Sequence, residues 1–319
     1  MRILITGGAG FIGSNLAEKL LNDERITKVR VLDSLVTGSL QNIKDFTSHP
    51  RFEFIEGDIR NYETCLRACE NIDYISHQAA LGSVPRSIND PLTTNDVNIT
   101  GTLNIFTAAK EKGVKRIVYA ASSSTYGDHP DLPKVEDKIG NPLSPYAVTK
   151  FVNELYARVY GSLYEMELIG LRYFNIFGPK QDPQGAYAAV IPLFVKAVLK
   201  DKAPVINGDG GHTRDFTFVS NAVDANIAAM FSKNDKAVNQ VYNIACGQQM
   251  SLLELFNNLK KQAGSSLVPV HGPDRAGDVK HSLADISKAK TLLDYQPAVS
   301  VEEGLTVTFD WYKNNPERL

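Results

Sequence analysis

A tyrosine and a lysine four residues apart, Tyr146 and Lys150, are the residues of this chain best suited to chemistry. Positions four apart in a helix lie on one face, so the phenol and the ammonium would be neighbours. A phenol has a pKa of about 10 and is a poor base at pH 7. We expect the Lys150 cation to lower the pKa of Tyr146, so that the phenolate can act as a general base.

A run of hydroxyl side chains, Ser122-Ser123-Ser124, follows the apolar run 116–121. Such a run is typical of a buried strand, and sites in parallel sheets form at the carboxyl ends of strands. A hydroxyl there could hydrogen-bond the substrate oxygen from which Tyr146 takes a proton. The three residue types together predict proton transfer to and from a substrate hydroxyl.

A glycine-rich turn over residues 7–13 joins a short apolar run to an amphipathic one. Gly7 permits a tight turn, Gly10 lets the backbone approach a pyrophosphate, and Gly13 lets the helix pack close to the strand. Asp33 ends the next apolar run, 20 residues after Gly13. A carboxylate at this spacing binds ribose hydroxyls and repels a 2′-phosphate, so the pattern predicts a site for NAD rather than NADP.

The elements that must position these groups follow from the hydrophobic pattern. Six apolar runs in the first 180 residues are typical of strands buried on both faces: 2–6, 28–33, 52–56, 72–77, 116–121 and 168–173. Amphipathic runs typical of helices lie between them: 11–21, 62–68, 98–112 and 145–160. Strand–helix alternation implies parallel pairing with right-handed crossovers, and so an α/β Rossmann doubly wound sheet.

The alternation of apolar and amphipathic runs ends after Gly178, where prolines become frequent. Helices are expected there over 188–200, 222–231 and 252–263. We predict an NAD-binding domain over residues 1–180. Residues 181–319 are expected to form mainly a smaller α/β substrate-binding portion, with chain crossings between the two.

Composition excludes several classes of protein. The 319 residues carry 34 Lys and Arg against 36 Asp and Glu, a balance that argues against nucleic-acid binding. No apolar run approaches the roughly 18–20 residues that span a bilayer, and the start of the chain lacks a signal peptide pattern, so we expect a cytoplasmic protein without membrane contact. Three cysteines cannot form a disulfide framework, and no His/Cys cluster has the spacing of a metal site.

The glycine fingerprint with Ser122, Tyr146 and Lys150 resembles the extended short-chain dehydrogenase/reductase family over nearly the whole chain. Further stretches are similar to the nucleotide-sugar 4-epimerases of that family: 78–80, 172–175, 207–210, 214–215 and 275–278. Two more, 81–86 and 185–192, resemble more narrowly the bacterial UDP-N-acetylhexosamine 4-epimerases.

The resemblance implies a role for each matching position. The expected cofactor contacts are Gly7, Gly10, Phe11, Ile12, Gly13, Asp33, Asp58, Ile59, Gln78, Ala79, Ala80, Tyr146, Lys150 and Tyr173. The expected contacts with a UDP-sugar are Ser83, Arg86, Ser123, Ser124, Asn175, Ala189, Val190, Val205, Asn207, Arg214, Arg275, Asp278 and Ser282.

Some of these positions have a second interpretation. Asp58 follows the third apolar run and could instead cap the next helix. Arg214 and Arg275 suit a diphosphate because a guanidinium binds phosphate with two hydrogen bonds, yet each alone resembles a surface ion-pair residue.

The implied reaction is C4 epimerisation through a transient 4-keto sugar. Tyr146 would take the O4 proton while the C4 hydride passes to NAD, and the positive nicotinamide ring would also favour the phenolate. Ser122 would polarise O4. Return of the hydride to the other face of the sugar would invert C4. Dehydratases and decarboxylases of the family carry acids where this chain has Ser123 and Ser124, which disfavours both reactions.

In the family, the residue four after Asp278 lines the wall beside the sugar C2 substituent. Here it is Ser282, whose small side chain predicts UDP-GlcNAc and UDP-GalNAc as substrates, for polysaccharide biosynthesis. The alternatives are a UDP-glucose/UDP-galactose or UDP-uronate 4-epimerase, a net dehydrogenase, and an NAD-binding regulator without activity.

The resemblance also implies a homodimer through a four-helix interface. Its expected apolar residues are Ile99, Leu103, Phe106, Phe151, Leu155 and Tyr156. The alternative is that these side chains only cover the sheet.

Overall fold

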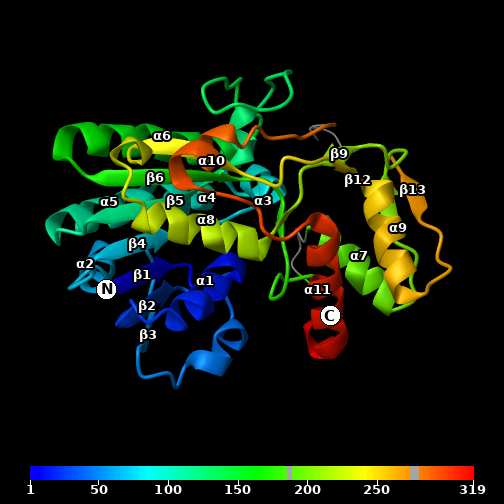
Figure 1. Ribbon diagram of the computed structural model, residues 1–319, viewed down its shortest axis with the longest axis horizontal. Coiled ribbons are helices and arrows are strands. Elements are labelled where there is room, and N and C mark those ends of the chain that lie inside the picture. The colour runs from blue at the N-terminus through cyan, green and yellow to red at the C-terminus, as the bar shows by residue number, and fades with distance from the viewer. Residues whose placement is uncertain (185–188, 274–279) are drawn as a thin grey trace.

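Seven parallel strands form the central sheet in the order β11-β6-β5-β4-β1-β2-β3 (Figure 1). The computed structural model describes residues 1–184, 189–273 and 280–319. The strands are β1 (Arg2–Thr6), β2 (Lys28–Asp33), β3 (Phe52–Glu56), β4 (Tyr74–His77), β5 (Arg116–Ser122), β6 (Glu167–Tyr173) and β11 (Gln240–Ile244). The predicted doubly wound α/β fold is confirmed, and six of its strands are the predicted ones. The seventh, β11, pairs with β6 and comes from beyond residue 180.

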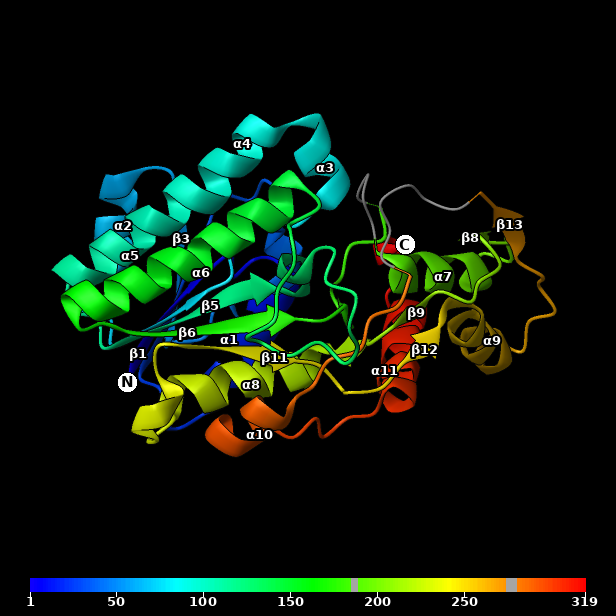
Figure 2. The ribbon, with the colours of Figure 1, turned by 90° about the horizontal axis from the view of Figure 1, so that it is seen from above.

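Helices cover both faces of this sheet (Figure 2). On one face lie α2 (Tyr62–Ala68), α5 (Gly101–Glu111) and α6 (Pro145–Tyr164); on the other lie α1 (Phe11–Leu21), α8 (Val219–Phe231) and α10 (Ser287–Leu293). Side chains of a strand alternate between the faces, so Ile3 and Ile5 join one buried cluster and Leu4 joins the other. Burial on both faces explains the continuous apolar runs in the sequence.

The start of α6, a helix that flanks the cleft, is fixed by its own first residues. The Ser144 hydroxyl accepts a hydrogen bond from the Ala147 N–H and caps α6, whose first residue is Pro145. The predicted helix 98–112 differs: α3 (Val84–Asn89) and α4 (Pro91–Asn95) precede a π-helical turn, Asp96–Thr100, and regular α-helix begins only at Gly101.

A smaller lobe lies beyond the carboxyl ends of the strands, at the right in Figure 1. It contains α7 (Val190–Leu199), α9 (Leu252–Ala263) and α11 (Val301–Asn314). Three short strand pairs complete it: β7 (Ile176–Phe177) with β10 (Thr217–Phe218), β8 (Val205–Asn207) with β13 (Val270–Gly272), and β9 (Thr213–Arg214) with β12 (Met250–Ser251).

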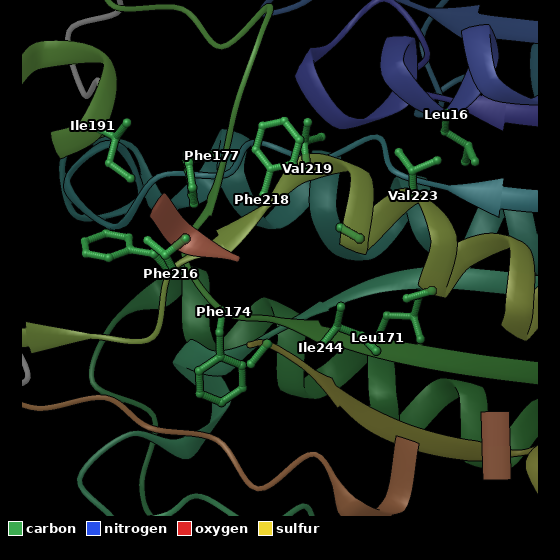
Figure 3. Close-up of a cluster of buried hydrophobic side chains, with 14 of the residues drawn as sticks. Leu16, Leu171, Phe174, Phe177, Ile191, Phe216, Phe218, Val219, Val223 and Ile244 are labelled. Carbon is green, nitrogen blue, oxygen red and sulfur yellow. The ribbon is translucent and has the colours of Figure 1, made fainter. Parts of the chain in front are cut away.

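One hydrophobic core continues from the sheet into this lobe. Phe174, Phe177 and Phe218 are buried at the junction, and the same cluster extends to Ile191 of α7 on the lobe side and to Leu16 of α1 on the sheet side (Figure 3). The rings of Phe177 and Phe218 meet edge to face, with centroids 5.7 Å apart. Through the described ranges, no helix is long and apolar enough to cross a membrane.

Candidate active site

A cleft of about 1400 Å³ opens at the carboxyl ends of the strands, between the sheet and the lobe. Such an edge is where parallel α/β sheets hold their ligands. Twenty of the predicted site residues line it: Gly7, Gly10, Phe11, Ile12, Gly13, Asp33, Asp58, Ile59, Gln78, Ala79, Ala80, Ser83, Arg86, Ser122, Ser123, Tyr146, Lys150, Tyr173, Asn175 and Ala189.

The glycine turn forms the floor of the cleft and fits a dinucleotide. Gly7 has φ +70°, and a Cβ at Gly13 would lie 2.2 Å from the Gly7 carbonyl oxygen, so the tight packing of turn on helix requires glycine. Helix α1 begins after Gly10 and has no side-chain cap on its first turn. Backbone N–H groups at such a helix start bind phosphate, so the turn suits the pyrophosphate of NAD.

The Asp33 carboxylate lies at the end of β2, on the wall of the cleft. It accepts hydrogen bonds from the backbone N–H groups of Ala9 (2.9 Å) and Leu35 (2.8 Å), which fix its orientation. Burial raises its pKa, and these hydrogen bonds oppose the rise. A buried, oriented acid next to the glycine turn fits the ribose hydroxyls of NAD.

Asp58 does not cap the following helix, so that alternative interpretation is wrong. Its carboxylate accepts a hydrogen bond from the Arg60 N–H (2.8 Å) and forms an ion pair with the Arg60 guanidinium (2.7 Å). The cap of α2 is Asn61, whose side chain accepts from the Thr64 N–H. The contacts with Arg60 lower the pKa of Asp58, which stays ionised on the cleft wall.

Ser122 is the last residue of β5, and its hydroxyl faces the cleft. The Ser124 N–H (3.1 Å) and the Ser124 hydroxyl (2.9 Å) both donate to the Ser122 Oγ. Ser124 does not line the cleft within the described part of the chain. The structure thus gives it a supporting contact with Ser122, where the resemblance implied a contact with the sugar.

Tyr146 and Lys150 lie on one face of α6, as their spacing predicts. Burial raises the pKa of Tyr146, and only a hydrogen bond with Ser122 opposes the rise. The Lys150 Nζ is 6.0 Å from the ring centroid and donates instead to the Ala120 carbonyl (2.8 Å). Burial also lowers the pKa of Lys150 to about 8. Burial disfavours the charged form of each group, because both are enclosed by protein.

Gln78 and Tyr173 form a second wall of the cleft. Asn226, a residue that the sequence analysis did not single out, hydrogen-bonds both side chains. The Asn226 Nδ2 donates to the Tyr173 hydroxyl (2.7 Å), and the Asn226 Oδ1 accepts from the Gln78 Nε2 (3.0 Å). The Tyr173 hydroxyl in turn donates to the Gln78 Oε1 (3.1 Å). Asn226 is fully buried in α8. A polar side chain inside an apolar helix pattern was its only signal.

The expected sugar end of the cleft is built from three elements. Ser83 caps α3 by accepting the Arg86 N–H (3.2 Å), and both residues line the cleft. Asn175 lies at φ +39° between β6 and β7, and its Nδ2 donates to the Asp215 carbonyl (3.0 Å). The Asp215 carboxylate is buried and accepts the N–H groups of Cys246 and Ala284, which ties the lobe together.

Several expected substrate residues lie on the lobe outside this cleft lining. Among the residues that the structure describes, these are Val190, Val205, Asn207, Arg214 and Ser282. The Arg214 guanidinium donates to the carbonyls of Thr213 (3.0 Å) and Lys280 (3.1 Å), and the Ser282 N–H donates to Thr213 (3.1 Å). The two are thus neighbours. Arg275 and Asp278 lie outside the described residues.

The sequence interpretation missed three segments that line the cleft. They are the segment after β2, with Ser34, residues 36–39, Gln41 and Asn42; the loop after β7, Lys180 to Gln184; and Glu317 with Arg318 near the end of the described chain. None has a motif that marks it as functional, since their place follows from tertiary packing.

Comparison with known proteins identifies the family. The model of the NAD dependent epimerase/dehydratase family matches residues 3–245. The UDP-glucose 4-epimerase of Mycolicibacterium smegmatis is 36% identical over 99% of this chain and 100% of its own. Two solved structures are also similar.

The first is the UDP-N-acetylglucosamine 4-epimerase from Methanobrevibacter ruminantium M1 in complex with UDP-N-acetylmuramic acid, with TM-score 0.93 and 36% identity over 98% of both chains. The second is the UDP-glucuronic acid 4-epimerase from Bacillus cereus in complex with UDP-glucuronic acid and NAD, with TM-score 0.92 and 34% identity over 99% of this chain and 100% of that one. The predictions of an enzyme and of NAD are confirmed, and the chain belongs to the NAD-dependent epimerase/dehydratase family.

Proposed function

We propose that this protein is a UDP-sugar 4-epimerase that interconverts UDP-GlcNAc and UDP-GalNAc. The observation that carries the proposal is the convergence of Ser122, Tyr146 and Lys150 with the glycine turn on one cleft. A hydroxyl, a phenol and an ammonium next to a dinucleotide site are the groups that coupled proton and hydride transfer needs.

Each residue has a role in the proposed reaction. The Tyr146 phenolate takes the proton from the sugar O4 and later returns it, and Ser122 donates a hydrogen bond to O4. Lys150 holds α6 against β5 through Ala120 and favours the phenolate by its charge. The chemistry that NAD supplies when bound is reversible hydride acceptance from C4.

Inversion requires the 4-keto sugar to present its other face. Asn175 and Arg214 would hold the diphosphate while the sugar rotates, because both can donate hydrogen bonds to phosphate oxygens. Val190, Val205 and Asn207 would hold the uridine. Arg275 is the expected second cation at the diphosphate.

Elimination of water is disfavoured. Ser123 and Ser124 stand at the positions where dehydratases of the family carry acids, and the Ser124 hydroxyl donates to Ser122. Neither side chain can act as an acid or base near pH 7. Oxidation followed by reduction from the opposite side is the reaction that these residues support.

The preference for an acetamido sugar rests on Ser282, the small residue expected beside C2. The similar Methanobrevibacter ruminantium enzyme is named for UDP-N-acetylglucosamine. The second candidate is epimerisation of UDP-glucose or UDP-glucuronate, which the names of the similar Mycolicibacterium smegmatis and Bacillus cereus proteins favour.

We also propose that the protein is a homodimer. Several apolar side chains of α6 face solvent, among them the predicted Leu155 (42% exposed) and Tyr156 (36%), and also Leu163 (67%). An exposed apolar helix face of this kind is typical of a subunit interface. Phe106, which we expected there, is instead fully buried against the sheet.

One assay separates the substrate candidates. The protein is incubated with UDP-GlcNAc, UDP-Glc, UDP-GlcA and UDP-Gal in turn, and NMR follows the sugar protons. The proposal predicts conversion of UDP-GlcNAc with the largest kcat/KM. Conversion of UDP-GlcA or UDP-Glc alone would replace it with the second candidate.

A further inference from the structure

Two segments from beyond the sheet reach back to the cofactor side of the cleft. They are the loop 178–184, which follows β7, and the short helix η6 (Pro316–Arg318). They are far apart in sequence, but the loop contacts α11, the helix that precedes η6, because the Tyr312 hydroxyl donates to the Gln181 carbonyl. Both segments line the cleft, as do residues 36–39, Gln41 and Asn42.

Helix η6 is connected to the glycine turn through one intervening residue, Asn42. The Arg318 guanidinium donates to the Asn42 Oδ1. Asn42 is buried, and its Nδ2 donates to the Ala9 carbonyl (2.9 Å). The Ala9 N–H donates to the Asp33 carboxylate (2.9 Å). A single residue therefore separates Arg318 from the turn expected to hold the pyrophosphate.

The loop 178–184 contacts the helix that follows that turn. The Lys180 Nζ is 2.6 Å from the Glu18 carboxylate of α1, and the lysine side chain is only 13% exposed. The Asn15 Nδ2 donates both to the Pro179 carbonyl (3.2 Å) and to the Phe11 carbonyl (2.9 Å). The loop is therefore attached to the first two turns of α1.

We propose that these two segments form a clasp that retains NAD in the cleft. Release of the cofactor would require the Arg318–Asn42 and Lys180–Glu18 contacts to open, because these contacts hold the two segments against the glycine turn and its helix at the cleft. The inference rests on the proposed function, in which every turnover regenerates the cofactor and release is never needed.

The test measures cofactor release without any sugar. Protein loaded with radiolabelled NAD is diluted into excess unlabelled NAD, and rapid gel filtration gives the label retained over time. We expect Arg318→Gln and Lys180→Gln each to accelerate release, and the double variant to release label at least about ten-fold faster than the wild type. Glu18→Gln breaks the Lys180 contact from the other side and should match Lys180→Gln.

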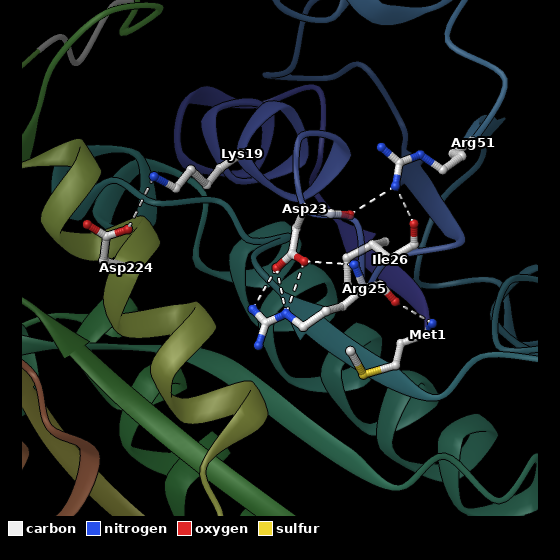
Figure 4. A network of polar contacts seen from close by, with 7 residues as sticks. All are labelled: Met1, Lys19, Asp23, Arg25, Ile26, Arg51 and Asp224. Carbon is white, nitrogen blue, oxygen red and sulfur yellow. Dashed lines mark hydrogen bonds and ion pairs between the residues drawn. The ribbon is translucent and has the colours of Figure 1, made fainter.

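Lys19→Gln is the matched control. Lys19 lies on the same helix α1, and its Nζ is 4.0 Å from the Asp224 carboxylate of α8, but neither residue lines the described cleft (Figure 4). Its release rate should stay within two-fold of the wild type, and thermal unfolding verifies that every variant is folded. Release from the double variant within two-fold of the wild type, or equal acceleration by Lys19→Gln, would overturn the clasp. Because no sugar is present, failure of the epimerase proposal would show separately, as lack of conversion by a protein that still binds NAD.

Discussion

The Lys150 ammonium donates a hydrogen bond to the Ala120 carbonyl in β5, two residues before Ser122. The same strand thus carries the hydroxyl expected to polarise the substrate and anchors the cation expected to favour the phenolate. Lys150 has a mechanical role, because it fixes α6 against β5, besides its electrostatic one. Its lowered pKa of about 8 means that its charge changes close to physiological pH.

Tyr146→Phe should lower kcat by about 10²- to 10⁴-fold, the usual contribution of a positioned acid or base. Phenylalanine keeps the ring volume, so the fold and the NAD content should be retained. Steady-state turnover and the NAD released by acid from purified protein check the two parts. Wild-type turnover in this variant would reject Tyr146 as the base.

His77 should make the protein sensitive to acid. Its Nδ1 is 2.6 Å from the Thr6 hydroxyl and its Nε2 is 3.0 Å from the Thr102 hydroxyl, which donates to the Asn98 carbonyl. Complete enclosure lowers the pKa of His77 to about 3. Between pH 6.5 and 3 the unfolded chain binds a proton that the native protein does not. The free energy of unfolding should therefore fall as the pH drops, by up to about 1.4 kcal/mol per pH unit.

His77→Gln removes this titration, so its free energy of unfolding should change less steeply with pH. Urea denaturation at several pH values between 6.5 and 4 measures both slopes. Parallel slopes for the wild type and His77→Gln would contradict the assigned protonation.

Ser282→Tyr tests the proposed sugar preference. If Ser282 lies beside C2, a bulky ring should lower kcat/KM for UDP-GlcNAc at least about ten-fold more than for UDP-Glc, because only the acetamido group needs the space. Ser282→Ala, which keeps the space, is the control. Equal losses on both substrates in side-by-side assays would remove Ser282 from the C2 wall.

Leu163→Glu should convert the proposed dimer to a monomer, since a charge buried in an apolar interface lacks a partner. Sedimentation velocity measures the change. Leu253→Glu, at an exposed leucine of α9, should leave the dimer intact. A wild-type protein that sediments as a monomer would contradict the homodimer.

The strands that carry the site were predictable because burial on both faces leaves continuous apolar runs, and β1 (Arg2–Thr6) has the predicted bounds. β11 (Gln240–Ile244) was missed since its five residues include Gln240 and Asn243, which interrupt the apolar pattern. Tyr146 was found through its spacing to Lys150, but spacing cannot indicate how deeply protein encloses the two groups. Burial raises the pKa of Tyr146, an effect that no local sequence pattern reports.

Residues whose role depends on tertiary contacts could not be predicted from the sequence. Asn226 supports Tyr173 from a helix whose pattern is apolar, and Arg318 contacts Asn42 across 276 residues of chain. Neither contact leaves a local motif. The glycine turn could be predicted because its local backbone geometry restricts residue type directly, as the φ of +70° at Gly7 illustrates.

The most direct test of the account follows the hydrogen at C4. UDP-GlcNAc carrying deuterium at C4 is incubated with the protein in ordinary water, and NMR and mass spectrometry follow the configuration and the label. The account predicts inversion at C4 with the deuterium retained in both epimers, because one hydride leaves and the same hydride returns. Loss of deuterium to solvent during inversion would contradict it.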